Sequence, residues 1–148
     1  MDDSDTQALS IGRLVLRETF VNNTLIPEEV KAKISGKGDY FLLIFIPRDD
    51  VVKVSLFPCK TPKIKKLLIQ LEEFSPELVK GISTALKQLN LADHIMHTTG
   101  LCFSAEKCFY ETYLDASNLE AGQLGDIRAE FERIPRVLDV SIVEVELK

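Results

Sequence analysis

Two histidines and two cysteines lie close together in the stretch DHIMHTTGLCFSAEKC, which begins at Asp93. They are His94, His97, Cys102 and Cys108. Imidazole nitrogens and thiolate sulfurs are ligands that zinc prefers. The H-x2-H and C-x5-C spacings nevertheless match no common zinc pattern, and on a strand His97 would point away from the face that His94 and Cys102 share. We therefore expect a structural role for these residues, with no metal and no cofactor.

The other polar residues form no pattern that is typical of a catalytic centre. Glu72 and Glu73 are adjacent, so on a strand they point to opposite faces and cannot act as an acid–base pair. The sequence GKGD at Gly36–Asp39 is typical of a turn and lacks the length of a phosphate-binding loop. We therefore expect that the protein is not an enzyme.

The charge of the chain is unevenly distributed. The net charge is −5, which argues against a nucleic-acid partner if the chain is taken as a whole. Residues 6–60 nevertheless carry eight Lys and Arg against six Asp and Glu, whereas residues 61–148 carry ten against fourteen. This difference is a weak indication that the two parts of the chain have different functions.

The composition is that of a globular protein, with 45% hydrophobic and 28% charged residues. No apolar run is long enough to span a bilayer, and the acidic start MDDSDTQ is unlike a signal peptide. The three cysteines, Cys59, Cys102 and Cys108, form no CxxC spacing, so we expect free thiols. These features favour a cytoplasmic protein without a membrane partner.

The segment FPCKTPK (Phe57–Lys63) has two prolines and no periodicity, which predicts a boundary. After it, strand-like alternation and helical apolar spacing follow in the order β-α-β-β-α-β. Ser75 and Pro76 are typical of a helix start. The expected strands and helices are Lys63–Phe74, a helix after Ser75, His94–Ser104, Cys108–Asp115, a helix over Gly122–Arg133, and Val137–Leu147. This order predicts a ferredoxin-like fold.

Before the boundary the order is different. IGRLVLRETF (Ile11–Phe20) predicts a strand, PEEVKAKI a two-turn helix started by Pro27, and FLLIFIP with VVKVSLFP two strands around a turn at Arg48–Asp50. A β-α-β-β unit of this size is too small to build a stable core alone. We expect it to be stabilised by dimerisation or by packing on its neighbour.

The residues RLVLRETFVNNTLIPEEVKAKI, followed by SGKGDYFLLIF and VVKVSLFP, resemble the AbrB-type swapped-hairpin DNA-binding domain over about residues 10–58. This resemblance implies a homodimer that binds DNA through the first strand, the following loop and the short helix. The matching positions are Arg13, Arg17, Asn22, Asn23, Lys31 and Lys33. Arg13 and Arg17 are four residues apart and would share one face of a strand.

The C-terminal order and the loop EEFSPELVKG (Glu72–Gly81) resemble an ACT domain, a small-molecule-sensing module. The family commonly has Pro-Gly where this chain has Pro76 and Glu77. The resemblance implies that an amino acid or a related small metabolite binds at the loop between the first strand and the first helix. The matching positions are Phe74, Ser75, Glu77 and Leu78.

Together these features predict an α+β protein with three parts. They are a disordered lead-in (residues 1–8), a swapped-hairpin, β-barrel-like unit (residues 9–60) and an ACT-like βαββαβ domain (residues 61–148). The function we expect is that of a cytoplasmic, dimeric or higher-order DNA-binding regulator whose C-terminal domain senses a small molecule or mediates dimerisation. The alternative is a metabolite-sensing or protein-assembly module that does not bind DNA.

Overall fold

The computed structural model describes residues 9–104 and 107–148. The lead-in expected over residues 1–8 lies outside the described residues, as do residues 105 and 106 between the strands expected at His94–Ser104 and Cys108–Asp115. The described chain forms two antiparallel sheets and four α-helices. It therefore has an α+β fold, as the sequence predicted.

The contacts within the chain divide it into two compact units. The first comprises the chain up to Lys63 together with Val145–Lys148, and the second is the continuous segment Ile64–Glu144. The last residues join the first unit through a bridge between Leu14 and Leu147 and a 2.8 Å hydrogen bond from the Lys148 amide to the Leu14 carbonyl. Two chain connections therefore run between the units.

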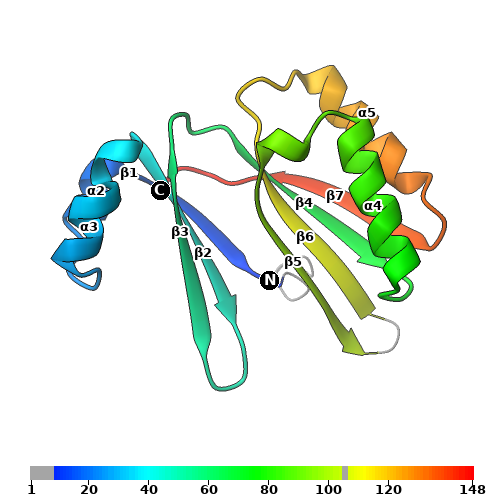
Figure 1. The fold of residues 1–148 in the computed structure, drawn as a ribbon, viewed down its shortest axis with the longest axis horizontal. Coiled ribbons are helices and arrows are strands. Elements are labelled where there is room, and N and C mark those ends of the chain that lie inside the picture. Colours follow the sequence, from blue (N-terminus) through cyan, green and yellow to red (C-terminus); the bar gives the residue numbers. More distant parts are fainter. Residues whose placement is uncertain (1–8, 105–106) are drawn as a thin grey trace. The chain divides into compact units, whose positions relative to one another are not determined.

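The N-terminal unit is a three-stranded antiparallel sheet with two short helices. Its elements are β1 (Ile11–Leu16), α2 (Arg17–Val21), α3 (Glu28–Ile34), the 3-10 turn η1 (Ser35–Lys37), β2 (Tyr40–Pro47) and β3 (Val52–Cys59). The strand order is β1-β2-β3. Helix α3 begins directly after Pro27, as the sequence predicted. Figure 1 shows both helices at the end of the sheet that is away from the β2–β3 turn.

The first strand is shorter than the alternation in Ile11–Phe20 predicted, because Arg17 already begins α2. The side chain of Arg17 turns back towards the segment before β2. Its Nε donates to the Gly38 carbonyl at 2.7 Å, and its Nη2 donates to the Asp39 carboxylate at 2.8 Å. The prediction that Arg13 and Arg17 share a strand face is therefore wrong.

A small aromatic core holds the helices on the sheet. The rings of Phe20 and Phe41 stack with their centroids 4.1 Å apart, and Val15 completes the buried cluster. Ile26 of the α2–α3 loop and Ile34 of α3 pack against it. Leu43 and Leu56 also pack against it, so the core covers the half of this sheet face that lies next to the helices.

The C-terminal unit is a four-stranded antiparallel sheet with both helices on one face (Figure 1). Its elements are β4 (Ile64–Leu71), α4 (Pro76–Gln88), the 3-10 turn η2 (Ala92–His94), β5 (Ile95–Ser104), β6 (Lys107–Asp115), α5 (Ala121–Glu132) and β7 (Val137–Glu144). The strand order β5-β6-β4-β7 places the first and third strands of the unit in the centre. This is the ferredoxin-like order that the sequence predicted.

The core of this unit lies between the sheet and the two helices. Leu67, Ile69 and Leu71 alternate along β4 and are fully buried, because strand residues two apart point to the same face. Ile82 of α4 and Phe131 of α5 pack in the same cluster and are also fully buried. The apolar stripes read from the sequence are therefore confirmed as core positions.

The expectation of three free thiols is wrong. Cys59 is a buried thiol outside the disulfide, whereas Cys102 and Cys108 form a disulfide with their Cα atoms 3.9 Å apart. The β5–β6 register places the two cysteines directly opposite each other. Spacing alone could not indicate this pairing, because it depends on which residues of the hairpin are paired.

Candidate functional site

An arginine in a left-handed backbone conformation lies between α5 and β7. Arg136 has φ +74°, a conformation that costs a residue with a side chain roughly 1–2 kcal/mol and is normally left to glycine. Its carbonyl accepts a 2.9 Å hydrogen bond from the amide of Glu72, so the residue adjoins the β4–α4 loop. Strained positions of this kind are concentrated at functional sites.

The guanidinium of Arg136 is shared by two carboxylates, that of Glu73 in the β4–α4 loop and that of Glu77 in the first turn of α4. Its Nη1 donates to Glu73, and its Nη2 lies 3.5 Å from Oε2 of Glu77. The Glu77 side chain is 86% exposed, so this long contact adds little to stability. The guanidinium can therefore exchange Glu77 for the carboxylate of a ligand, which it binds well in a bidentate geometry. We refer to Glu73, Glu77 and Arg136 as the Arg136 cluster.

Two of the four residues that the ACT resemblance assigns to a ligand hold the start of α4. The Ser75 hydroxyl caps the helix by accepting a 3.2 Å hydrogen bond from the Leu78 amide, and the Leu78 side chain is in the core at 2% exposure. The ring of Phe74 lies so close to Gly100 of β5 that a Cβ atom there would be 2.3 Å from Cζ. Glu77 is the member of the four with an exposed charge.

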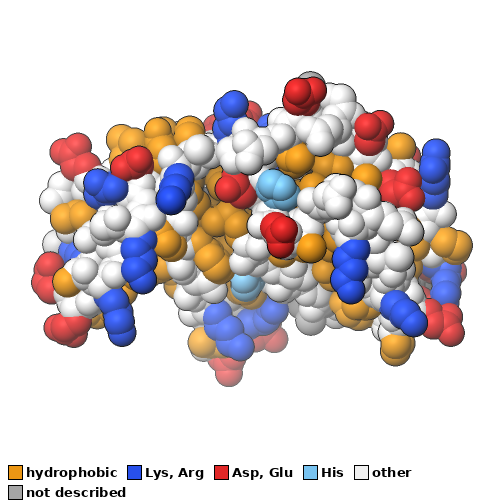
Figure 2. Space-filling model, turned by 45° about the horizontal axis from the view of Figure 1, so that its top comes forward, with side chains coloured by type: hydrophobic (Ala, Val, Ile, Leu, Met, Phe, Trp, Pro, Cys, Tyr) orange, Lys and Arg blue, Asp and Glu red, His pale blue; other side chains and the backbone are white. Residues whose placement is uncertain are grey.

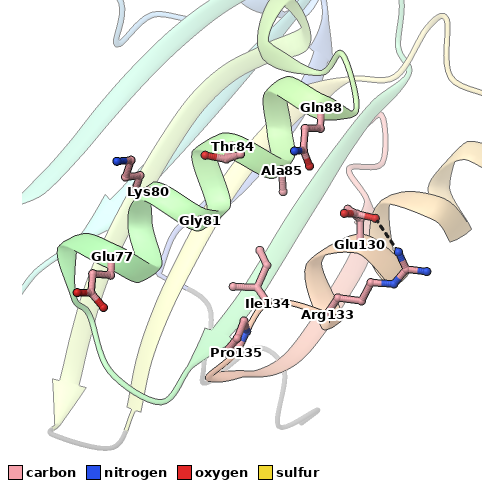
Figure 3. A pocket seen from close by; sticks show the side chains of 10 residues that line it. All are labelled: Glu77, Lys80, Gly81, Thr84, Ala85, Gln88, Glu130, Arg133, Ile134 and Pro135. Carbon is pink, nitrogen blue, oxygen red and sulfur yellow. Dashed lines mark hydrogen bonds and ion pairs between the residues drawn. The ribbon is translucent and has the colours of Figure 1, made fainter.

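A groove of about 470 Å³ lies between α4 and α5 (Figure 3). Its floor is formed by small or apolar residues, namely Gly81 and Ala85 of α4 with Ile134 and Pro135 beyond α5. Glu77 both lines the groove and contacts the guanidinium of the Arg136 cluster. The groove and the cluster therefore form one continuous site.

The rim of the groove is polar and carries charges of both signs. It consists of Glu77, Lys80, Thr84, Gln88, Glu130 and Arg133. Figure 3 shows Lys80 pointing away from α5, and Nη1 of Arg133 lies 3.3 Å from the Glu130 carboxylate. A ligand in the groove would thus meet an apolar floor, and Glu77 links the groove to the guanidinium of Arg136.

Three of the residues that the AbrB resemblance assigns to DNA have partners within the protein. The Lys31 side chain is buried, and its Nζ lies 3.2 Å from the Glu28 carboxylate, a position unsuited to a phosphate contact. Arg17 bonds the segment before β2. The side chain of Asn23 accepts a 2.8 Å hydrogen bond from the Leu25 amide, which shapes the loop between α2 and α3.

The other three residues, Arg13, Asn22 and Lys33, are exposed. Arg13 lies in β1 opposite Leu43, Asn22 ends α2, and Lys33 is in α3. The six residues therefore do not form a single group of free cations. On the face drawn in Figure 2, basic and acidic side chains are interspersed.

The histidines and cysteines of the first motif do not form a metal centre in the described chain. His94 ends η2, whereas His97 is in β5 with its Nε2 3.0 Å from the Thr99 hydroxyl oxygen. Within residues 9–104 and 107–148, no group of three or more His, Cys, Asp or Glu is arranged to hold a metal. None of the helices described is long and apolar enough to cross a membrane.

Glu73, Arg136 and the α4–α5 groove were not predicted from the sequence. Arg136 is 63 residues away from Glu73, and a left-handed position is usually signalled by glycine. The residue order did contain a hint. Pro135 must end the helix and β7 starts at Val137, so the single residue between them has to make the turn.

Comparisons with known proteins give no family for this chain. No family model matches the sequence, and no curated protein matches it. Among solved structures, the chain is similar to the solution structure of the C-terminal domain of the MgtC protein from Mycobacterium tuberculosis. The identity is 11% and the TM-score 0.47, and the match covers 55% of this chain and 86% of that chain. A likeness at this level carries no conclusion about function.

Proposed function

We propose that the protein is a non-catalytic regulator with a sensing unit and an output unit. The ferredoxin-like unit binds a small zwitterion, such as an amino acid, at the Arg136 cluster. The N-terminal unit, which resembles a swapped-hairpin domain, binds DNA as a dimer. The observation that supports the sensing half is Arg136 itself. Its backbone has a strained left-handed conformation, and its guanidinium lies between two carboxylates.

The chemistry of the site matches an amino acid in three respects. The guanidinium of Arg136 suits the α-carboxylate, and the exposed carboxylate of Glu77 suits the α-ammonium group. The groove floor at Gly81 and Ile134 suits an aliphatic side chain. Ligand binding would replace the weak 3.5 Å contact between Arg136 and Glu77, so little native interaction is lost.

A thermal-shift experiment with individual L-amino acids tests the sensing half. A ligand at about 100 times its Kd stabilises the folded state by about 2.7 kcal/mol, which raises Tm by a few degrees. We expect at least one aliphatic amino acid to give this shift in the wild type. Arg136→Gln should abolish the shift, because the carboxylate loses its bidentate donor.

Arg133→Gln is the matched control, because Arg133 also lines the groove and pairs with a glutamate. It should keep the response to the ligand. Arg136→Gly separates binding from folding, since glycine relieves the backbone strain. This variant should keep about the Tm of the unliganded wild type and still fail to respond. A full response in Arg136→Gly would contradict the proposal.

The output half is supported by the division of charge between the units. Apart from the three aspartates of residues 1–8, the first unit carries ten Lys and Arg against seven Asp and Glu, whereas residues 64–144 carry eight against thirteen. A segment with an excess of positive charge in an acidic chain favours an anionic partner such as DNA. Lys33 is its best candidate for a phosphate contact because it is exposed on α3.

Fluorescence anisotropy with a mixed-sequence DNA duplex at several salt concentrations tests the output half. We expect salt-sensitive binding near 50 mM salt. Lys33→Ala should weaken binding and reduce the slope of log K against log salt by about 1. The control Lys87→Ala, on α4 of the acidic unit, should leave the slope unchanged. An absence of salt-sensitive binding in the wild type would contradict DNA binding and leave the sensing half standing.

A further inference from the structure

Large apolar side chains are exposed on one face of the N-terminal sheet. Ile11, Phe45 and Val54 lie side by side across its three strands. Ile11 is 55% exposed and Val54 50%, and Val52 in the neighbouring row is 56% exposed. We call these four residues the apolar patch. The apolar patch is on the same sheet face as Phe41. Helices α2 and α3 lie at the end of the sheet away from the β2–β3 turn (Figure 1) and leave the patch uncovered. Contiguous apolar patches of this kind mark interaction sites.

Opposite charges flank the apolar patch. Arg13 is on the same face, two residues along β1 from Ile11. On the other side of the patch, the turn between β2 and β3 carries Asp49 and Asp50, together with Arg48. Arg13 and both aspartates are exposed, and none of the three forms an ion pair within the described part of the chain. The patch thus lies between an unpaired cation and a turn with two unpaired anions.

We propose that a second copy of this chain covers the apolar patch. The two-fold axis would run across the strands through the row of Ile11, Phe45 and Val54. Such an axis reverses the strand direction between the two copies. The Arg13 side of the row in one copy therefore faces the β2–β3 turn side of the row in the other copy. Arg13 is two residues, about 7 Å, from the row. Its long side chain would then reach towards the Asp49–Asp50 turn of the other copy.

Two features favour a second copy over an unrelated partner. The patch is self-complementary, because the cation and the anions lie on opposite sides of its central row. Its β-branched and aromatic side chains also suit face-to-face packing of two sheets, which are about 10 Å apart in such contacts. The proposal assigns Arg13 to a subunit interface instead of DNA. It goes beyond the proposed function and does not depend on it.

Sedimentation velocity of the full chain over a range of concentrations tests the interface. The wild type should be a dimer, and Val54→Glu should weaken the dimer by more than about 100-fold, because it buries an unpaired charge. The control Val143→Glu changes a valine of β7 that is 48% exposed and should remain dimeric. A monomeric wild type, or a Val54→Glu variant that stays dimeric, would overturn the proposal.

Charge reversal decides the geometry of the dimer, and it also decides the case if Val54→Glu fails to fold by circular dichroism. Arg13→Glu should weaken the dimer by about tenfold, and so should Asp49→Lys combined with Asp50→Lys, because each brings like charges together. Combining all three substitutions should restore the affinity. If the combination is as weak as either parent or weaker, Arg13 does not meet the turn of the other copy and the two-fold arrangement is wrong.

Discussion

Replacing Glu111 by glutamine is expected to lower the free energy of unfolding by about 3–5 kcal/mol, because it leaves the Lys66 ammonium buried without its countercharge. Nζ of Lys66 lies 3.0 Å from the Glu111 carboxylate, and the two side chains are 10% and 0% exposed. The same ammonium lies 5.6 Å from the ring centroid of Tyr113. Urea denaturation followed by circular dichroism measures the loss.

The control for this prediction lies on the same strand. Lys65 and Glu144 also form an ion pair, but the distance is 3.9 Å and the Glu144 side chain is 63% exposed. Glu144→Gln should therefore change stability by less than about 1 kcal/mol. The double variant Lys66→Met and Glu111→Leu should recover most of the loss, since it removes both charges. A loss below about 1 kcal/mol for Glu111→Gln would show that the pair behaves as a solvent-exposed ion pair and contradict the prediction.

Gly38→Ala is expected to destabilise the N-terminal unit by about 3 kcal/mol, because the added methyl group has no space. A Cβ atom at this position would lie 2.7 Å from both the amide nitrogen and the carbonyl oxygen of Cys59. These are backbone atoms of β3 and cannot move aside as the end of a flexible side chain can. The φ of Gly38 is −163°, so crowding and not backbone conformation is the cause.

Gly36→Ala is the matched control, because no atom lies within 4 Å of the Cβ that it adds. It should be neutral or stabilise the unit by up to about 1 kcal/mol through the unfolded state. Thermal unfolding of both variants beside the wild type measures the difference. Equal Tm values for the two variants would contradict the steric explanation. The crowding in Gly38→Ala would also displace the Gly38 carbonyl, which accepts a hydrogen bond from Arg17.

The ferredoxin-like unit could be predicted because its signals are local. Leu67, Ile69 and Leu71 alternate within one strand, and Ser75 caps a helix through an amide three residues later. Each of these interactions acts within a few residues, so the sequence pattern and the final structure agree. The order of the elements then left few possible topologies.

The failures have the opposite character, since each depends on a distant partner. Arg17 starts a helix because it bonds to Gly38 and Asp39, more than 20 residues later, although its neighbours alternate like a strand. The bridge between Cys102 and Cys108 depends on the register of the β5–β6 hairpin. Arg136 contacts Glu73, although the two residues are 63 positions apart in the sequence. Periodicity contains none of this information.

The two connections between the units have a consequence for how the chain can be taken apart. Lys65 lies directly opposite Glu144 in the β4–β7 pair, so the ferredoxin-like unit begins and ends at neighbouring residues. Segments with adjacent ends are the ones that proteins accept as insertions. The ferredoxin-like unit is thus an insertion in the N-terminal unit, located between β3 and Val145–Lys148. A short glycine-rich splice from Lys63 to Val145 would excise it and keep both Leu14 and Leu147.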